Sequence, residues 1–163
     1  MMIPPNSPET TKRRRILLAD DHELIREGIA AVIARAPEFT ICGTAGNEQA
    51  ACELLARHRP DILLIDLSIS RRDGLSFLND LLASHPALRI LVLAAYAEER
   101  YADRVLHSGA LGYFLKSDSG ARLMQAIQTV AAGKVYAHPR LTSFTTPVPR
   151  GHLAETGGWL PAQ

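Results

Sequence analysis

The sequence has little of what marks several classes of protein. Only two cysteines occur in 163 residues, and Cys42 and Cys52 show no metal-ligand spacing, so neither a disulfide-rich nor a zinc-stabilised fold is expected. No apolar run approaches the roughly 20 residues of a membrane-spanning helix. The polar, proline-containing start lacks the apolar core of a secretion signal. We therefore expect a cytoplasmic protein with reduced cysteines and no membrane partner.

An excess of charge of either sign is missing too. The 18 lysines and arginines nearly balance the 17 aspartates and glutamates, and the net charge of +1 gives no strong attraction to nucleic acid or to an anionic membrane. The basic run at residues 12–15 contains no aromatic residue, and we interpret it as a solvated flank. The composition therefore indicates an ordinary globular domain, and its function must be sought in a local site.

Between residues 16 and 132, short apolar runs alternate with helical patterns. Such runs, without polar alternation, are typical of parallel strands buried on both faces. The alternation predicts an α/β fold in which helices cover both faces of one parallel sheet and are joined to it by right-handed crossovers. The predicted strands are residues 16–19, 39–45, 62–65, 89–93 and 111–115, and the predicted helices are residues 22–36, 47–58, 75–84, 98–107 and 120–132.

The two ends of the chain lack this pattern. Residues 1–14 are polar and end in basic residues, and residues 138–163 hold several prolines among small and polar residues. Both compositions are typical of disordered segments. We predict one folded domain over residues 15–137, preceded by a basic lead-in and followed by a tail without a DNA-binding domain.

Charged residues follow three of the predicted strands. Asp20 and Asp21 end the first strand, Asp66 ends the third and Lys116 ends the fifth. In an open parallel sheet of strand order 2-1-3-4-5, ligands bind beyond the carboxyl ends of the strands, and strands one and three are neighbours there. Carboxylates that lie so close repel one another unless a cation is bound. Oxygen ligands favour Mg²⁺ over Zn²⁺.

The same residues can act together on a phosphoryl group. Asp66, on the central strand, is the candidate nucleophile that would form an aspartyl phosphate. Asp21 would hold the metal with help from Asp20, and the backbone carbonyl of Ser68 could supply a further oxygen. Lys116 would balance the charge of the phosphoryl group. These residues therefore predict a Mg²⁺-dependent phosphoacceptor site.

Each of these residues also has an ordinary structural interpretation. An aspartate after a strand is most often a loop or helix-capping residue, and Lys116 could be a solvated loop lysine. Their joint occurrence at three strand ends favours the site. His22 is a tempting ligand or acid, but beside a helix start we interpret it as an exposed residue of the capping region.

Three segments together resemble the receiver domain of a two-component response regulator of the NarL/FixJ (LuxR-like) type. They are residues 16–22 (ILLADDH), residues 61–68 (DILLIDLS) followed by Asp73-Gly74-Leu75, and residues 109–116 (GALGYFLK). The resemblance covers nearly four fifths of the chain and implies a flavodoxin-like sheet of order 2-1-3-4-5.

The resemblance also implies roles for single residues. Asp66 would accept a phosphoryl group from a phosphohistidine of a sensor histidine kinase, and Lys116 would contact that group. Asp20 and Asp21 would bind Mg²⁺. Tyr113 matches the rotameric aromatic residue that reports activation to the surface around the fourth helix and fifth strand, although a half-buried strand aromatic is the alternative.

The chain departs from the family pattern in three places. Ala94 stands where a threonine or serine usually bonds the phosphoryl oxygen, which predicts weakened switching after phosphorylation. Ser70 replaces a frequent proline, so the loop with Arg71 and Arg72 is expected to be more mobile or more basic. The helix-turn-helix domain of NarL/FixJ regulators is not found after residue 141, and we expect no direct binding of DNA.

Several functions remain open on this basis. The first is a phosphorylated module that signals by protein contacts, with a histidine kinase and a second receiver copy as candidate partners. Others are a remnant of a LuxR-type transcription regulator and a pseudo-receiver with impaired switching. An aspartyl-phosphate hydrolase usually has an acid two residues after its nucleophile, and Ser68 holds that position, so we do not expect an enzyme.

Overall fold

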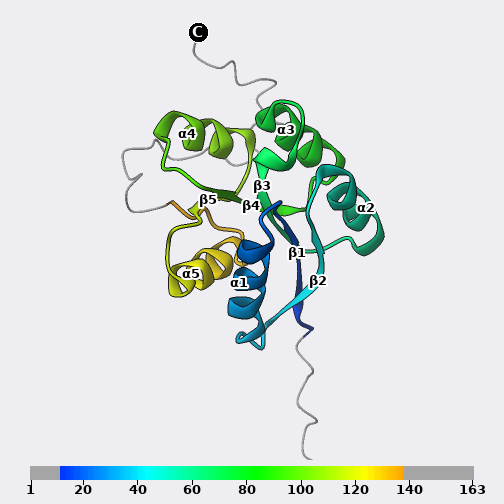
Figure 1. The fold of residues 1–163 in the computed structure, drawn as a ribbon, viewed down its shortest axis with the longest axis vertical. Helices are drawn as coiled ribbons and strands as arrows, with labels where there is room; N and C mark the ends of the chain where they lie inside the picture. Colours follow the sequence, from blue (N-terminus) through cyan, green and yellow to red (C-terminus); the bar gives the residue numbers. More distant parts are fainter. Residues whose placement is uncertain (1–11, 138–163) are drawn as a thin grey trace, which may run out of the picture.

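The computed structural model describes residues 12–137, which form five parallel strands and five helices in strict alternation (Figure 1). The predicted disordered segments at residues 1–11 and 138–163 lie outside the described residues. The elements are β1 (Arg14–Ala19), α1 (Glu23–Ala34), β2 (Phe39–Ala45), α2 (Glu48–His58), β3 (Ile62–Asp66), the 3₁₀ turn η1 (Leu67–Ile69), α3 (Gly74–Ser84), β4 (Arg89–Ala94), α4 (Glu99–Ser108), β5 (Gly112–Leu115) and α5 (Gly120–Ala131).

The strands pair in the order β2-β1-β3-β4-β5, and every pair is parallel. This is the flavodoxin-like topology that the sequence predicts. Because β1 and β3 lie side by side at the centre, the residues after them meet at one edge of the sheet. None of the described helices combines the length and the apolar character needed to cross a membrane.

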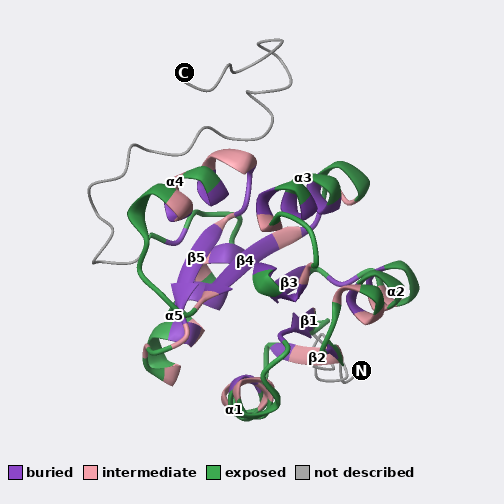
Figure 2. Ribbon diagram, turned by 45° about the horizontal axis from the view of Figure 1, so that its top comes forward, coloured by how far each residue is buried: buried purple, intermediate pink, exposed green. Residues whose placement is uncertain are grey.

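Helices cover both faces of the sheet, α1 and α5 on one and α2, α3 and α4 on the other (Figure 1). Successive residues of a strand point to opposite faces. In β1, Ile16 and Leu18 pack with α1 and α5, while Leu17 packs with α2 and α3. Figure 2 shows the central strands buried almost throughout. The continuous apolar runs in the sequence thus reflect strands with no solvent face.

Local signals fix several helix ends close to where the sequence predicts them. The side chain of Asn47 caps α2 by accepting the backbone N–H of Ala50 at 2.8 Å, and Ser119 caps α5 in the same way. Gly109 adopts a left-handed conformation (φ 113°) at the end of α4, as is common for a terminal glycine.

The start of β1 is the main difference in element bounds. The apolar pattern predicts a strand from residue 16, but pairing begins at Arg14, which lies opposite Phe39 of β2. Hydrogen bonding to β2 extends the strand by two residues whose side chains are polar, so the apolar pattern does not detect them. Arg14, which is the last residue of the predicted lead-in over residues 1–14, therefore belongs to β1.

Candidate functional site

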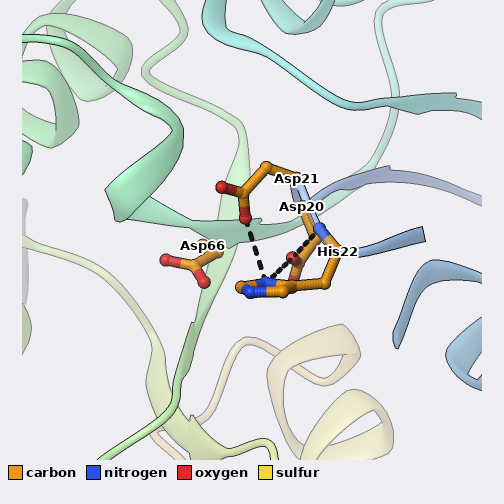
Figure 3. Close-up of side chains that lie close together, drawn as sticks. All are labelled: Asp20, Asp21, His22 and Asp66. Atoms are coloured by element: carbon orange, nitrogen blue, oxygen red, sulfur yellow. Dashed lines mark hydrogen bonds and ion pairs between the residues drawn. The ribbon is translucent and has the colours of Figure 1, made fainter. Parts of the chain in front are cut away.

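Four side chains converge at the carboxyl edge of the central strands (Figure 3). One ligand atom each from Asp20, Asp21, His22 and Asp66 lies within 4.8 Å of all the others. Asp20 follows β1 and is completely buried, whereas Asp66 is the last residue of β3 and only 8% exposed. The predicted proximity of the three carboxylates is confirmed, and it follows from the adjacency of β1 and β3.

Lys116 reaches the same point from the end of β5. Its Nζ lies 2.5 Å from Oδ2 of Asp20 and donates a hydrogen bond to Oδ2 of Asp66. The lysine side chain is only 7% exposed, so Lys116 is not a solvated loop residue. Its backbone N–H donates to the carbonyl of Ala94 at 2.8 Å, which holds Lys116 against the end of β4.

The contacts with Lys116 set the protonation of the pair. Burial by itself would raise the pKa of Asp66, but hydrogen bonds from Lys116 and from the backbone N–H of Ser68 outweigh it, and the pKa is lowered. Burial would likewise lower the pKa of Lys116, yet hydrogen bonds to Asp20 and Asp66 raise it. Asp66 is therefore an ionised carboxylate at neutral pH, the form that can act as a nucleophile.

His22 takes a more central position than the sequence indicates. It is the N-cap of α1 and its ring is 63% exposed, which agrees with an exposed residue at the helix start. However, its Nδ1 lies 3.1 Å from Asp20 Oδ1 and 3.0 Å from Asp21 Oδ1, so the ring leans onto both carboxylates (Figure 3). Ring direction at a helix start depends on tertiary contacts, and no signal in the sequence reports it.

The residues present fit a Mg²⁺ ion. The donor set consists of carboxylate oxygens, which Mg²⁺ prefers. Oδ2 of Asp20 is fully buried, and it forms an ion pair with the Lys116 ammonium. Buried carboxylates opposed by so little positive charge are stabilised by a further cation. The Ser68 carbonyl stays a predicted ligand; its N–H donates to Asp66 Oδ1 at 2.8 Å.

Ala94 and Tyr113 occupy neighbouring strands near this edge. Ala94 ends β4 and pairs with Leu115, and its side chain is a methyl group without a hydrogen-bond donor. Tyr113 is 2% exposed, donates its hydroxyl to the Tyr96 carbonyl at 2.9 Å and meets the Tyr101 ring edge to face. Burial raises the pKa of Tyr113 to about 12. The ring therefore lies fully inside, beyond the half-buried position that the sequence allows.

The loop after Asp66 is more closely tied to its neighbours than the Ser70 substitution suggests. The Ser70 hydroxyl lies 3.1 Å from Glu48 of α2. The Arg72 guanidinium pairs with Glu48 and with Asp80 of α3, and it stacks 5.7 Å from the Phe77 ring centre. Because these acids pair the Arg72 charge, the loop contributes less to a basic surface than its two arginines predict.

A doubly covered parallel sheet of this order, with a carboxylate cluster and a lysine at its carboxyl edge, defines a receiver-like signalling domain. Residues 16–128 match the family model of the response regulator receiver domain. The chain belongs to that family, within the lineage of NarL/LuxR-type response regulators of two-component systems.

Relatives and solved structures agree with this assignment. Transcriptional regulatory protein DegU of Brevibacillus brevis is 34% identical over 137 residues, which are 84% of this chain and 58% of DegU. Response regulator GacA of Pseudomonas viridiflava is 32% identical over 78% of this chain and 59% of GacA. The chain thus spans about three fifths of the length of these curated relatives.

Two solved structures share the fold closely. A LuxR-family response regulator from Aurantimonas sp. SI85-9A1 superposes with a TM-score of 0.74 at 30% identity, over 80% of this chain and 94% of that one. The receiver domain of the putative response regulator NarL from Mycobacterium tuberculosis gives 0.70 at 28% identity, over 76% of this chain and 99% of that one.

Proposed function

We propose that the chain accepts a phosphoryl group on Asp66 from a sensor histidine kinase, in a Mg²⁺-dependent reaction, and signals through protein contacts in the cytoplasm. The observation that carries this proposal is the buried Asp66 carboxylate, held ionised by Lys116 beside two further carboxylates. Such a group is both a nucleophile and one side of a metal site.

The proposed chemistry requires little rearrangement of covalent bonds. A carboxylate oxygen of Asp66 forms a bond to phosphorus while the phosphorus–nitrogen bond of the donor phosphohistidine breaks, and the imidazole leaves with the electron pair of that bond. The Lys116 ammonium then faces the additional negative charge. Mg²⁺, when bound by Asp20, Asp21, Asp66 and the Ser68 carbonyl, supplies positive charge for the phosphoryl oxygens.

We further propose that phosphorylation changes the surface of this chain less than is usual in its family. Ala94 offers no hydroxyl to a phosphoryl oxygen, so a phosphorylated Asp66 gains no hydrogen bond from this β4 side chain. Tyr113 is already buried, with its hydroxyl on the Tyr96 carbonyl. The surface formed by α4 and β5 then stays mostly in one conformation whether or not Asp66 is phosphorylated. A second receiver copy or another protein binds that surface.

The experiment is phosphorylation by a small donor. The protein is incubated with acetyl phosphate, with and without Mg²⁺, and its intact mass is followed beside the Asp66→Asn variant. We expect a Mg²⁺-dependent gain of one phosphoryl group that the variant does not show. An unchanged mass of the folded native protein, or an equal gain in Asp66→Asn, would contradict the proposal.

A further inference from the structure

The edge opposite Asp66 carries a strong positive charge that the net charge conceals. Basic residues gather where the strands begin and the helices end, and the acidic residues there are Glu38 and Asp61. The overall charge is near zero only because the carboxyl edge is acidic. The basic residues of this amino edge are Lys12, Arg13, Arg14, Arg15, Arg35, Arg57, Arg59, Arg89 and Lys134.

The helix dipole accounts for only part of this concentration. Basic residues are favoured in the last turn of a helix, and Arg57 lies there in α2. The last turns of α1, α3 and α5 contain none. Arg14 and Arg89 begin β1 and β4, where no helix dipole selects a cation. The charge of this edge therefore calls for a further explanation.

Two of these guanidinium groups are held side by side. Arg14 and Arg89 come from strands on either side of β3, and both donate from Nη1 to the carbonyl of Ala131 at the end of α5. Two like charges that share one carbonyl repel each other, and an anion bound between them would relieve that repulsion. A guanidinium has five N–H donors, so one bond to Ala131 leaves donors for a ligand.

A groove of about 910 Å³ opens beside them, between the α2–β3 and α3–β4 connections. Arg14, Arg59 and Arg89 contribute to its lining together with apolar residues such as Leu55 and Pro60, so it combines cations with an apolar wall. Its volume lies within the range of small-molecule sites. Asp61 also lines the groove, and its Oδ2 accepts the backbone N–H of Arg15 at 2.8 Å.

We propose that this basic edge binds clustered phosphate groups, and that the groove lined by Arg14, Arg59 and Arg89 is the binding site. Phosphate oxygens accept paired hydrogen bonds from guanidinium groups in a geometry that suits arginine better than lysine. Two of the three arginines that line the groove, Arg14 and Arg89, are held by the carbonyl of Ala131, so their guanidinium groups are partly preorganised. The proposal does not depend on phosphorylation of Asp66, which lies at the opposite edge.

The test is a titration of the metal-free full chain at constant ionic strength. Inorganic pyrophosphate represents a small phosphate ligand, a short single-stranded oligonucleotide represents a phosphodiester chain, and poly-glutamate represents a carboxylate polyanion. Amide chemical shifts report both the affinity and the place of binding. Without Mg²⁺, the carboxylates around Asp66 repel all three probes.

We expect Arg14→Gln, Arg59→Gln and Arg89→Gln each to weaken binding of the phosphate probe about tenfold. Arg100→Gln and Arg104→Gln change the net charge by the same amount but lie on α4. These two variants should therefore change the affinity for the phosphate probe little. Asp61→Asn should strengthen binding several-fold. Arg14 and Arg89 also bond to the end of α5, so a thermal melt of each variant is required, whereas Arg59→Gln keeps the backbone bond from Arg59 to Leu55.

Binding of pyrophosphate assigns the groove to a small phosphorylated ligand, and binding of the oligonucleotide alone assigns it to a phosphodiester chain. Equal affinity for poly-glutamate, equal loss in the α4 variants, or no binding of either phosphate probe would overturn the proposal. The site is separate from Asp66: Asp66→Asn should bind pyrophosphate normally, and the arginine variants should still be phosphorylated by acetyl phosphate.

Discussion

The two edges of the sheet differ in the burial of their charged side chains. At the carboxyl edge, Asp20, Asp66 and Lys116 are almost completely buried and contact one another. At the amino edge, residues such as Arg13, Arg57 and Lys134 are exposed. Buried charges depend strongly on their partners, because the cost of leaving one unpaired is high, whereas exposed charges are screened by water and salt. Equal charges at the two edges therefore have very unequal consequences for stability.

The sharpest test of this comparison replaces one lysine at each edge. Lys116→Met leaves Asp20 and Asp66 buried without their cation and should lower the free energy of unfolding by about 3 kcal/mol in the absence of metal. Lys134→Met at the amino edge should change it by less than about 0.5 kcal/mol. Urea denaturation measures both. Equal effects of the two substitutions would show that burial does not distinguish the edges.

Magnesium should partly restore the Lys116→Met variant. A divalent cation compensates the same carboxylates that the ammonium contacts, so the stability lost in the variant should be smaller in Mg²⁺ than in EDTA. The control is again Lys134→Met, whose small deficit should not depend on Mg²⁺. A deficit in Lys116→Met that Mg²⁺ leaves unchanged would argue against a metal site at this edge.

The next effect concerns pH and has a defined sign. Because the pKa of Asp66 is lower in the folded state than its ordinary value of 3.8, its contribution is present above that value and is lost as the pH falls through the folded pKa. The pKa of Lys116 is raised above 10.5, so its contribution is present below that value and is lost as the pH rises through the folded pKa. Metal-free urea midpoints of the native protein should fall in acid below about pH 4.

Asp66→Asn is the matched variant for the acid limb, since it keeps the side-chain volume and removes the ionisable group. As the pH falls from neutral into the acid range, the urea midpoint of Asp66→Asn should decline less steeply than that of the native protein. Parallel acid profiles would mean that other carboxylates, and not Asp66, determine the acid sensitivity.

A smaller effect separates the two consecutive aspartates. Asp21 is 49% exposed on its side chain and contacts the His22 ring, whereas Asp20 is buried against Lys116. Asp21→Asn should leave metal-free stability within about 0.5 kcal/mol of the native value but should reduce the stabilisation produced by Mg²⁺. Asp20→Asn should reduce both the metal-free stability and the stabilisation produced by Mg²⁺. Thermal melts in EDTA and in Mg²⁺ distinguish the two, and identical behaviour would refute this division of roles.

The positions of Asp20, Asp66 and Lys116 could be predicted because they depend on topology alone. Apolar runs identify the strands, parallel connection fixes which ends share an edge, and the residues that follow are thereby brought together. The approach of the His22 ring and the pairing of Arg72 could not be predicted, since both depend on which rotamer tertiary neighbours select. The basic edge as a whole could not be predicted from the net charge, because a net charge sums over the molecule and carries no positional information.

A small effect on stability, but the effect most informative about signalling, is expected for Ala94→Thr. Position 94 ends β4 and is half-buried, so a β-branched residue fits there and the free energy of unfolding should change by less than about 1 kcal/mol. The new hydroxyl can bond a phosphoryl oxygen and draw the β4–α4 connection inward. Phosphorylation should then slow amide exchange around Tyr96 and Tyr101 more in Ala94→Thr than in the native protein. Ala94→Val has nearly the same shape without the hydroxyl and should behave like the native chain, whereas an equal response in the valine variant would show that shape, and not the hydrogen bond, limits the coupling.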